Sequence, residues 1–325
     1  MPSSYTRRDF AKLALAALPT AGLLSAGNPL RAAEKPAKPG PKPDSRVAGV
    51  QIGLNVPYSF SSPVMSGDEI IERCLQLNLS AVELRAQPVE AFLGLPAILV
   101  ATKGGVPKEG APVDANTMRR RQWRSAVSMD RVREFRAKFD AAGVLIEILK
   151  VDGIFQMVSE ELDYIFGMGK ALGARALSTE ISKTSNEDHR RVGQFADKHK
   201  LMIGYHGHAA TTPEDWEKAF SVAKFNGANV DIGHFVAGNN LSPAAFIAKY
   251  HDRIPHVHIK DRKKQNGPNM PFGEGDTPIV EILRLIRDNR WNIQATIEFE
   301  YKVPAGSDRM TEIARAIKYC RDALA

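Results

Sequence analysis

Eight short apolar runs, placed between residues 49 and 299, constrain the fold of this chain more than any other feature. The runs are rich in Val, Ile and Leu, as strands of a buried parallel sheet are, and helical patterns lie between them. Regular alternation of strand and helix predicts a parallel sheet covered by helices. We therefore predict the α/β class and a single (β/α)8 TIM barrel. The predicted strands are residues 49–56, 81–84, 145–151, 174–179, 201–205, 228–232, 254–259 and 293–299.

Acidic residues and histidines end or follow five of these predicted strands. Because the C-terminal ends of barrel strands gather on one face, where active sites sit, we expect these side chains to converge there. Carboxylates and imidazoles that converge on one spot are ligands for divalent metal ions, so the pattern predicts a divalent-metal site. The five stretches are Leu177–Glu180, Gly204–His208, Val230–His234, His256–Asp261 and Ile297–Glu300.

The first 46 residues have the composition of an export signal followed by a linker. Arg7 and Arg8 precede an apolar segment, Leu13–Ala26, that is too short for a comfortable membrane span, so residues 1–33 are predicted to be a twin-arginine signal peptide. Residues 34–46 hold four prolines among lysines, which predicts a stiff, disordered linker. We expect the barrel to span residues 47–325, and the protein to be periplasmic or secreted without a stable membrane anchor.

The N-terminal region also accounts for most of the positive charge. Residues 1–46 carry eight Lys or Arg against three acids, a net charge of +5, which leaves +2 of the chain's +7 for the barrel. A nearly neutral barrel gives no electrostatic footprint for nucleic acid. Cys74 and Cys320 are the only cysteines, and we expect both to be buried thiols rather than a disulfide.

The segment from residue 87 to residue 128 breaks the strand–helix rhythm. It is long for a loop, rich in Pro and Gly, and follows the second predicted strand, so it should cover the C-terminal face. A lid or substrate-binding insertion and a solvated surface excursion both fit this pattern. Its four arginines are predicted to form a solvated helix face rather than a phosphate clamp: Arg119, Arg120, Arg121 and Arg124.

Several motifs make the chain resemble a known family. The sequence reads DIGHF at residues 231–235, HVHIKDRKKQNGPN at 256–269, GEGD at 273–276 and IEFEY at 297–301. In combination these motifs are similar to the xylose-isomerase-like TIM barrel superfamily, and more closely to its exported (twin-arginine) sugar phosphate isomerase/epimerase branch. The resemblance covers residues 47–319 and implies one divalent metal ion, with Mn²⁺ favoured and Co²⁺ or Mg²⁺ as alternatives.

The resemblance also implies roles for single residues. Matched motif by motif, the metal ligands would be Glu180, Asp231, His258 and Glu298. The substrate-binding candidates are His206, His208, His234 and Lys150. Relatives often have an Asn where this chain has Gly207, so one amide contact to substrate would be missing. Lys260 is the weaker candidate because we expect it to face away from His258.

The chemistry of such a site can also be argued from the residues. A divalent ion can polarise a sugar carbonyl and make the proton on the adjacent carbon acidic. Glu180 and Glu298 belong to the fourth and eighth predicted strands, which lie opposite each other in an eight-stranded barrel. They are thus placed as the catalytic acid–base pair across the substrate. We predict a metal-dependent isomerase or epimerase acting on an unphosphorylated sugar, since an exported enzyme would not meet phosphorylated metabolites.

Other functions fit the same residues. Proton abstraction with loss of a leaving group would make the protein a 3-keto-glycoside lyase or hydratase. A metal-dependent sugar-binding protein without turnover is a second alternative, and a metal-dependent phosphodiesterase or nuclease is a third that the near-neutral barrel disfavours. The expected partner is a small carbohydrate, with no nucleic acid, and the sequence leaves open whether the protein is a homo-oligomer.

Overall fold

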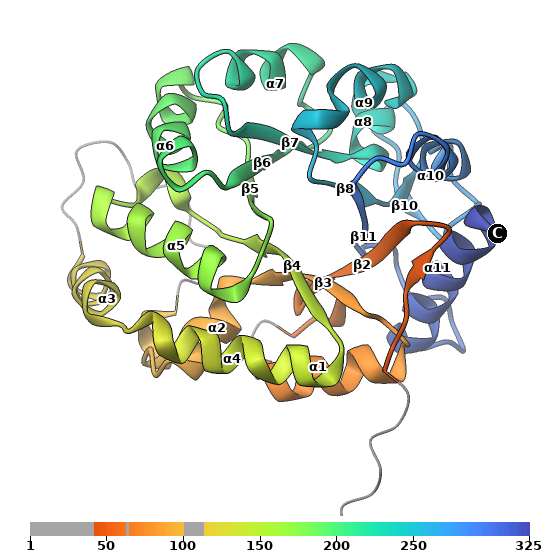
Figure 1. Cartoon of the computed structure of the whole chain (residues 1–325). Helices are drawn as coiled ribbons and strands as arrows, with labels where there is room; N and C mark the ends of the chain where they lie inside the picture. Colours follow the sequence, from red (N-terminus) through yellow and green to blue (C-terminus); the bar gives the residue numbers. More distant parts are fainter. Residues whose placement is uncertain (1–41, 63–64, 101–113) are drawn as a thin grey trace, which may run out of the picture. The chain divides into compact units, whose positions relative to one another are not determined.

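The barrel predicted from the alternating pattern is present. The computed structural model describes residues 42–62, 65–100 and 114–325, which belong to one compact unit. Within these residues, eight parallel strands pair in the order β2-β11-β8-β7-β6-β5-β4-β3, and β3 pairs with β2 to close the ring (Figure 1). The barrel strands are β2 (Val50–Val56), β3 (Ala81–Arg85), β4 (Leu145–Lys150), β5 (Ala176–Glu180), β6 (Met202–His206), β7 (Asn226–Asp231), β8 (His256–Ile259) and β11 (Gln294–Ile297).

Helices surround the ring, and most of them bury apolar residues against it (Figure 1). In α10 the buried residues are Ile279, Ile282, Leu283 and Ile286, whose three- and four-residue spacing places them on one face. The α-helices are α1 (Gly67–Gln76), α2 (Ala86–Phe92), α3 (Ala115–Ala126), α4 (Met129–Ala142), α5 (Ser159–Leu172), α6 (Asn186–His199), α7 (Pro213–Phe220), α8 (Ile232–Asn239), α9 (Ala244–Tyr250), α10 (Ile279–Asp288) and α11 (Arg309–Leu324). Short 3-10 helices are η2 (Tyr58–Phe60), η3 (Ala97–Leu99), η4 (Ile154–Gln156) and η5 (His251–Arg253).

Residues just before the barrel pack against the end of the barrel where the strands begin. β1 (Arg46–Val47) pairs antiparallel with the start of β2, and the Ser45 hydroxyl donates to the Ile52 carbonyl at 2.7 Å. Arg321 near the end of α11 donates to the carbonyls of Asp44 and Asn78. Residues 42–46 of the predicted linker therefore contact the barrel. The predicted export signal and residues 34–41 lie outside the described residues and stay predictions.

The segment from residue 87 to residue 128 contains most of α2, then η3 and α3, with residues 101–113 outside the described part. α3 is attached through a buried ion cluster. Arg124 Nε lies 2.8 Å from Glu90 Oε1 on α2, and Arg124 Nη1 lies 2.9 Å from Glu161 Oε1 on α5. All three side chains are at most 6 % exposed. The prediction that the four arginines form a solvated face was therefore wrong for Arg124, because its helix packs over two buried carboxylates.

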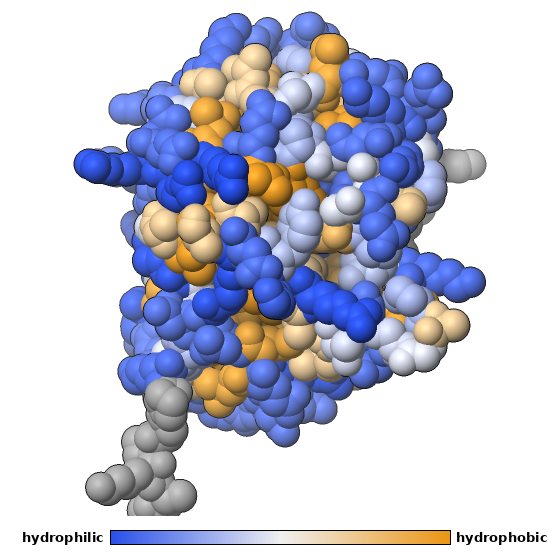
Figure 2. Space-filling model, turned by 90° about the vertical axis from the view of Figure 1, so that its right-hand side faces the viewer, coloured by the Kyte–Doolittle hydropathy of each residue, from blue (hydrophilic) through white to orange (hydrophobic). Residues whose placement is uncertain are grey.

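The remaining sequence expectations concern the surface and the thiols. Cys74 and Cys320 are free and fully buried, as predicted. In the described part of the chain, no helix combines the length and hydrophobicity that a membrane span requires. On the side of the molecule that carries α10 and α11, hydrophilic residues cover most of the surface, with hydrophobic residues between them (Figure 2).

Candidate active site

The interior of the barrel is polar from the middle of the strands to the mouth. Asn55 Nδ2 of β2 donates to Glu298 Oε1 at 2.9 Å. Asn229 Nδ2 of β7 lies 3.3 Å from Ser178 Oγ and 3.0 Å from His258 Nε2. These five side chains are at most 5 % exposed. Because buried polar groups need partners, their mutual contacts fix the direction of each side chain across the barrel.

An ammonium group lies at the centre of the mouth. Lys260 Nζ is 2.8 Å from Glu298 Oε2, 2.6 Å from Glu300 Oε2 and 3.1 Å from Asp231 Oδ2. It also lies 3.1 Å from His234 Nε2. Burial alone would lower the pKa of Lys260, but the three carboxylates outweigh burial and raise it well above its usual range. Lys260 in turn helps to keep the pKa values of Asp231 and Glu298 low, although burial would raise them.

The position of Lys260 corrects one of our predictions. Side chains two residues apart on a strand share a face, so Lys260 follows His258 into the barrel. The expectation that it faces away from His258 was wrong. The same rule places Glu298 and Glu300 together, and both contact the ammonium group of Lys260.

A buried carboxylate orients His258 from the side of the ring that faces away from the mouth. His258 Nε2 lies 2.5 Å from Glu83 Oε2, and both side chains are fully buried. His258 Nδ1 faces the mouth, 3.3 Å from Glu298 Oε2 and 3.9 Å from Asp231 Oδ2. Burial lowers the pKa of His258, but Glu83 and Glu298 outweigh this and raise it to about 10. A carboxylate on one ring nitrogen is the usual device that fixes a metal-binding histidine.

Glu180 stands on the opposite wall, at the end of β5. Its Oε1 accepts from Lys150 Nζ at 2.7 Å, and its Oε2 lies 3.4 Å from His208 Nδ1. Lys150 is buried, whereas the side chain of Glu180 is 45 % exposed and so reachable from the mouth. Burial opposes the charge of Lys150, but Glu180 and Glu83 outweigh it and raise the pKa.

Three histidines line the wall between these carboxylates. The His206 ring centroid lies 4.8 Å from that of His208 and 4.6 Å from that of His258. His208 and His234 are 5.0 Å apart by the same measure. Burial, reinforced by the nearby His258, holds the pKa of His206 well below its ordinary value, and burial lowers that of His234. Neutral imidazoles can both donate to and accept from sugar hydroxyls.

The donor groups of the mouth fit a divalent cation. Three of the four predicted ligands have a buried atom without a hydrogen bond among the described residues, namely Glu180 Oε2, Asp231 Oδ2 and His258 Nδ1. His206 Nδ1 is unpaired in the same way. Ligand atoms of His206, Asp231, His234 and Glu298 lie within 4.8 Å of one another. Asp231 and Glu298 belong both to the predicted ligand set and to this cluster. The cluster also contains His206 and His234, whereas the predicted ligands Glu180 and His258 lie outside it.

Gly207 is explained by packing. A Cβ atom at this position would lie 2.3 Å from Trp216 Cζ2, closer than real contacts allow. Trp216 is buried and its indole nitrogen donates to the Tyr205 carbonyl at 2.7 Å. The indole ring therefore fills the space that a side chain at residue 207 would need.

The loop after β8 is organised by one carboxylate. Asp261 Oδ2 accepts from the backbone amides of Gly273 at 2.8 Å and Gly275 at 2.9 Å, and its Oδ1 accepts from Thr277 N at 3.2 Å. A Cβ at Gly275 would lie 1.9 Å from Asp261 Oδ1, so glycine is needed there. Because these amides already donate to Asp261, they are not available to bind a phosphate group as the amides of a phosphate-binding loop do.

Sequence reasoning did not single out Glu83, Asn229 or Asn55. Each is a polar residue inside a strand and fully buried. The sequence signal that could have identified them is a single acid or amide within an apolar run. Burying such a group costs free energy unless it faces a polar interior, where it finds hydrogen-bond partners.

Comparisons with known proteins bear on the fold. The family model that matches residues 168–323 is described as a xylose isomerase-like TIM barrel. An inosose dehydratase of Clostridium perfringens is 24 % identical over 172 residues, which cover 46 % of this chain and 57 % of that protein. The matched part thus spans little more than half of that relative's length.

Solved structures support the fold over most of the chain. A xylose isomerase domain protein from Alicyclobacillus acidocaldarius superposes with a TM-score of 0.58 at 14 % identity, over 85 % of this chain and 99 % of the other. A sugar phosphate isomerase/epimerase from Parabacteroides distasonis gives a TM-score of 0.54 at 14 % identity, over 85 % and 95 %. Residues 168–323 thus match the xylose isomerase-like TIM barrel family, and the solved structures show that the barrel fold extends over most of the chain.

Proposed function

We propose that this protein is a divalent-metal-dependent enzyme that removes the proton beside the carbonyl of an unphosphorylated sugar, as an isomerase or epimerase. The observation that carries the proposal is the placement of Glu180 and Glu298. They come from β5 and from the end of β11, which are four strands apart on either path around the ring. A sugar held between them would have one carboxylate on each side, as proton removal and return require.

The residues of the mouth divide this work. Asp231 and Glu298, which belong both to the predicted ligand set and to the cluster described above, would hold the ion, which would polarise the carbonyl and stabilise negative charge on its oxygen. Glu180 is exposed enough to reach a substrate, and its Oε1 accepts a hydrogen bond from Lys150 Nζ. His208 and His234 face the same space and would bind sugar hydroxyls. Lys260 supplies a fixed positive charge beside Asp231 and Glu298.

Elimination is the second candidate, favoured by the partial match to inosose dehydratases. It begins with the same step. One carboxylate takes the proton beside the carbonyl, and the electron pair of that C–H bond forms a C=C bond as the leaving group departs from the next carbon. A proton delivered to the leaving oxygen would complete the loss of water or, from a 3-keto-glycoside, of an alcohol.

The unphosphorylated substrate rests on two arguments. The first is the predicted export signal at Arg7 and Arg8, which lies outside the described residues, so a periplasmic or secreted location is a proposal. The second is the site itself. Lys150 and Lys260 are already paired with carboxylates, and the amides after β8 already donate to Asp261. These two lysines and these amides are therefore not free to bind a phosphate group.

Solvent deuterium tests the proposal. The metal-loaded protein should incorporate deuterium beside the carbonyl when it is incubated in heavy water with free ketoses or 3-keto-glucosides. Glu298→Gln should lower this exchange by roughly 10²–10⁴-fold, because it removes an acid–base group. Glu281→Gln changes an exposed glutamate of α10 and serves as the matched control.

Three results would count against the proposal. Sugar binding without exchange or product for any of these sugars would indicate a binding protein. Product that keeps a label at the carbon beside the carbonyl would exclude proton abstraction. Equal exchange by the Glu298→Gln and Glu281→Gln variants, with metal content unchanged, would remove Glu298 from the catalytic pair.

A further inference from the structure

A large cavity lies beside the candidate active site. It occupies the part of the mouth formed by the ends of β11, β2, β3 and β4, whereas the histidines come from β6, β7 and β8. Its volume is about 940 Å³. Pockets of roughly 300–1,000 Å³ hold drug-sized ligands, so a single sugar ring would leave most of this space empty.

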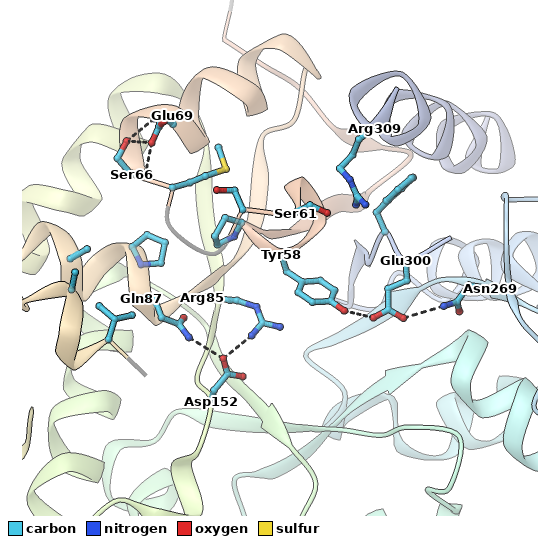
Figure 3. A pocket seen from close by; sticks show the side chains of 18 residues that line it. Tyr58, Ser61, Ser66, Glu69, Arg85, Gln87, Asp152, Asn269, Glu300 and Arg309 are labelled. Atoms are coloured by element: carbon cyan, nitrogen blue, oxygen red, sulfur yellow. Dashed lines mark hydrogen bonds and ion pairs between the residues drawn. The ribbon is translucent and has the colours of Figure 1, made fainter. Parts of the chain in front are cut away.

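The cavity wall is mostly apolar. Pro57, Met65, Pro88, Ala91 and Phe299 line it, together with the ring of Tyr58 (Figure 3). Pro88 and Ala91 belong to α2, in the first part of the segment from residue 87 to residue 128. That segment therefore contributes to a binding space through its described residues. An apolar wall of this extent favours an apolar ligand, because burial of apolar surface drives such binding.

The charged side chains of the described wall all have partners. Arg85 Nη1 lies 2.7 Å from Asp152 Oδ2, which also accepts from Gln87, as Figure 3 shows. Glu69 accepts from Ser66 in the capping box that begins α1. Arg309 donates to the Ser59 carbonyl and covers the Phe299 ring.

Glu300, the fifth charged residue of the wall, accepts from Tyr58 and pairs with Lys260. Among the described lining residues, Arg85, Asp152 and Glu300 are paired with opposite charges, whereas Glu69 and Arg309 have hydrogen-bond partners but no ion pair. The larger, apolar part of the wall favours a neutral group.

Glu300 joins the cavity to the catalytic carboxylates. Its Oε2 contacts the same ammonium group of Lys260 that lies 2.8 Å from Glu298, while its side chain lines the cavity. A sugar held between Glu180 and Glu298 would thus have one edge against Glu300. A substituent on that edge would enter the apolar space.

We propose that the cavity binds a neutral, apolar aglycone, so that the substrate is a glycoside with a carbonyl on its sugar ring rather than a free sugar. This inference rests on the proposed function, because it takes the sugar ring to lie between Glu180 and Glu298. It adds a second binding site, on β2, β3 and α2, for the part of the substrate that does not react.

Calorimetry with three probes tests the inference on the full-length, metal-loaded protein. The probes are 2-naphthyl β-D-glucopyranoside, methyl β-D-glucopyranoside and 2-naphthol. The naphthyl glycoside should bind at least tenfold more tightly than each of the other two, a difference of about 1.4 kcal/mol. Ala91→Trp would fill the cavity from an exposed position of α2 and should reduce the naphthyl preference to less than threefold. Ala137→Trp, at an exposed position of α4 outside the cavity wall, should keep it.

Each other outcome would overturn the inference. Equal affinity for the two glycosides would mean that the cavity does not take the aglycone. An unchanged preference in the Ala91→Trp variant would place the naphthyl group elsewhere. Binding of 2-naphthol as tight as that of its glycoside would show an apolar site unconnected to sugar recognition. Because none of these measurements needs turnover, failure of the deuterium exchange described above is a separate result.

Discussion

The buried ion cluster of Arg124 allows a quantitative prediction. The guanidinium group makes two hydrogen bonds to Glu90, at 2.8 and 3.2 Å, and one to Glu161 at 2.9 Å. Arg124→Met would leave Glu90 buried without a cation, whereas Glu161 would keep Arg121 at 3.1 Å. Removing one partner of a buried ion pair costs about 3–5 kcal/mol, because the remaining charge stays desolvated. We expect that loss in the free energy of unfolding.

Urea unfolding followed by circular dichroism would measure this change. A loss of 3–5 kcal/mol corresponds to a melting temperature lower by roughly 10 °C for a domain of this size. Adding Glu90→Gln to the Arg124→Met variant should restore at least half of the loss, since the uncompensated charge is then gone. Arg119→Met, at an exposed position of the same helix, is the matched control and should stay within about 0.5 kcal/mol of wild type. If Arg124→Met costs no more than this control, the cluster does not stabilise the fold as argued.

Two further predictions concern pH and packing. Burial lowers the pKa of His189 to about 4 from 6.5, so between these values the unfolded chain binds more protons and stability falls as the pH is lowered. His189→Gln removes this titration. The difference in unfolding free energy between the variant and wild type should therefore shift in favour of the variant by about 2 kcal/mol between pH 7 and pH 5. A difference that is the same at both pH values would contradict the assignment. Gly207→Asn must displace Trp216 and should cost about 1–3 kcal/mol, whereas Gly167→Asn, whose nearest neighbour to a new Cβ is at 3.7 Å, should cost less than 1 kcal/mol. Equal thermal unfolding of these two variants would refute the packing argument.

The barrel could be predicted from the sequence because each strand leaves its own local pattern. All eight predicted strands correspond to observed ones, with ends that differ by a few residues. The acids and histidines at the strand ends gather on one face as the topology requires. Their grouping within that face could not be derived, because it depends on which residues of neighbouring strands lie level with one another.

The cations of the protein show where sequence reasoning reached its limit. Lys260 could have been placed correctly, since the alternation of side chains decides its face. Arg124 could not have been placed from its neighbours in sequence, because its partners Glu90 and Glu161 lie 34 and 37 residues away. Glu83 lies 175 residues from His258, so its role as an orienting group depends on the closed ring of strands.

The contact of Arg321 with Asp44 and Asn78 has a practical consequence for experiments. It brings the last turns of α11 to the residues that precede β1 and β3, at the end of the barrel where the strands begin. The proposed catalytic carboxylates and the apolar cavity lie at the other end. A surface or a fluorescent reporter coupled through Ala325 would thus face away from incoming ligand, which makes the C-terminus the suitable point for immobilising this protein in binding assays.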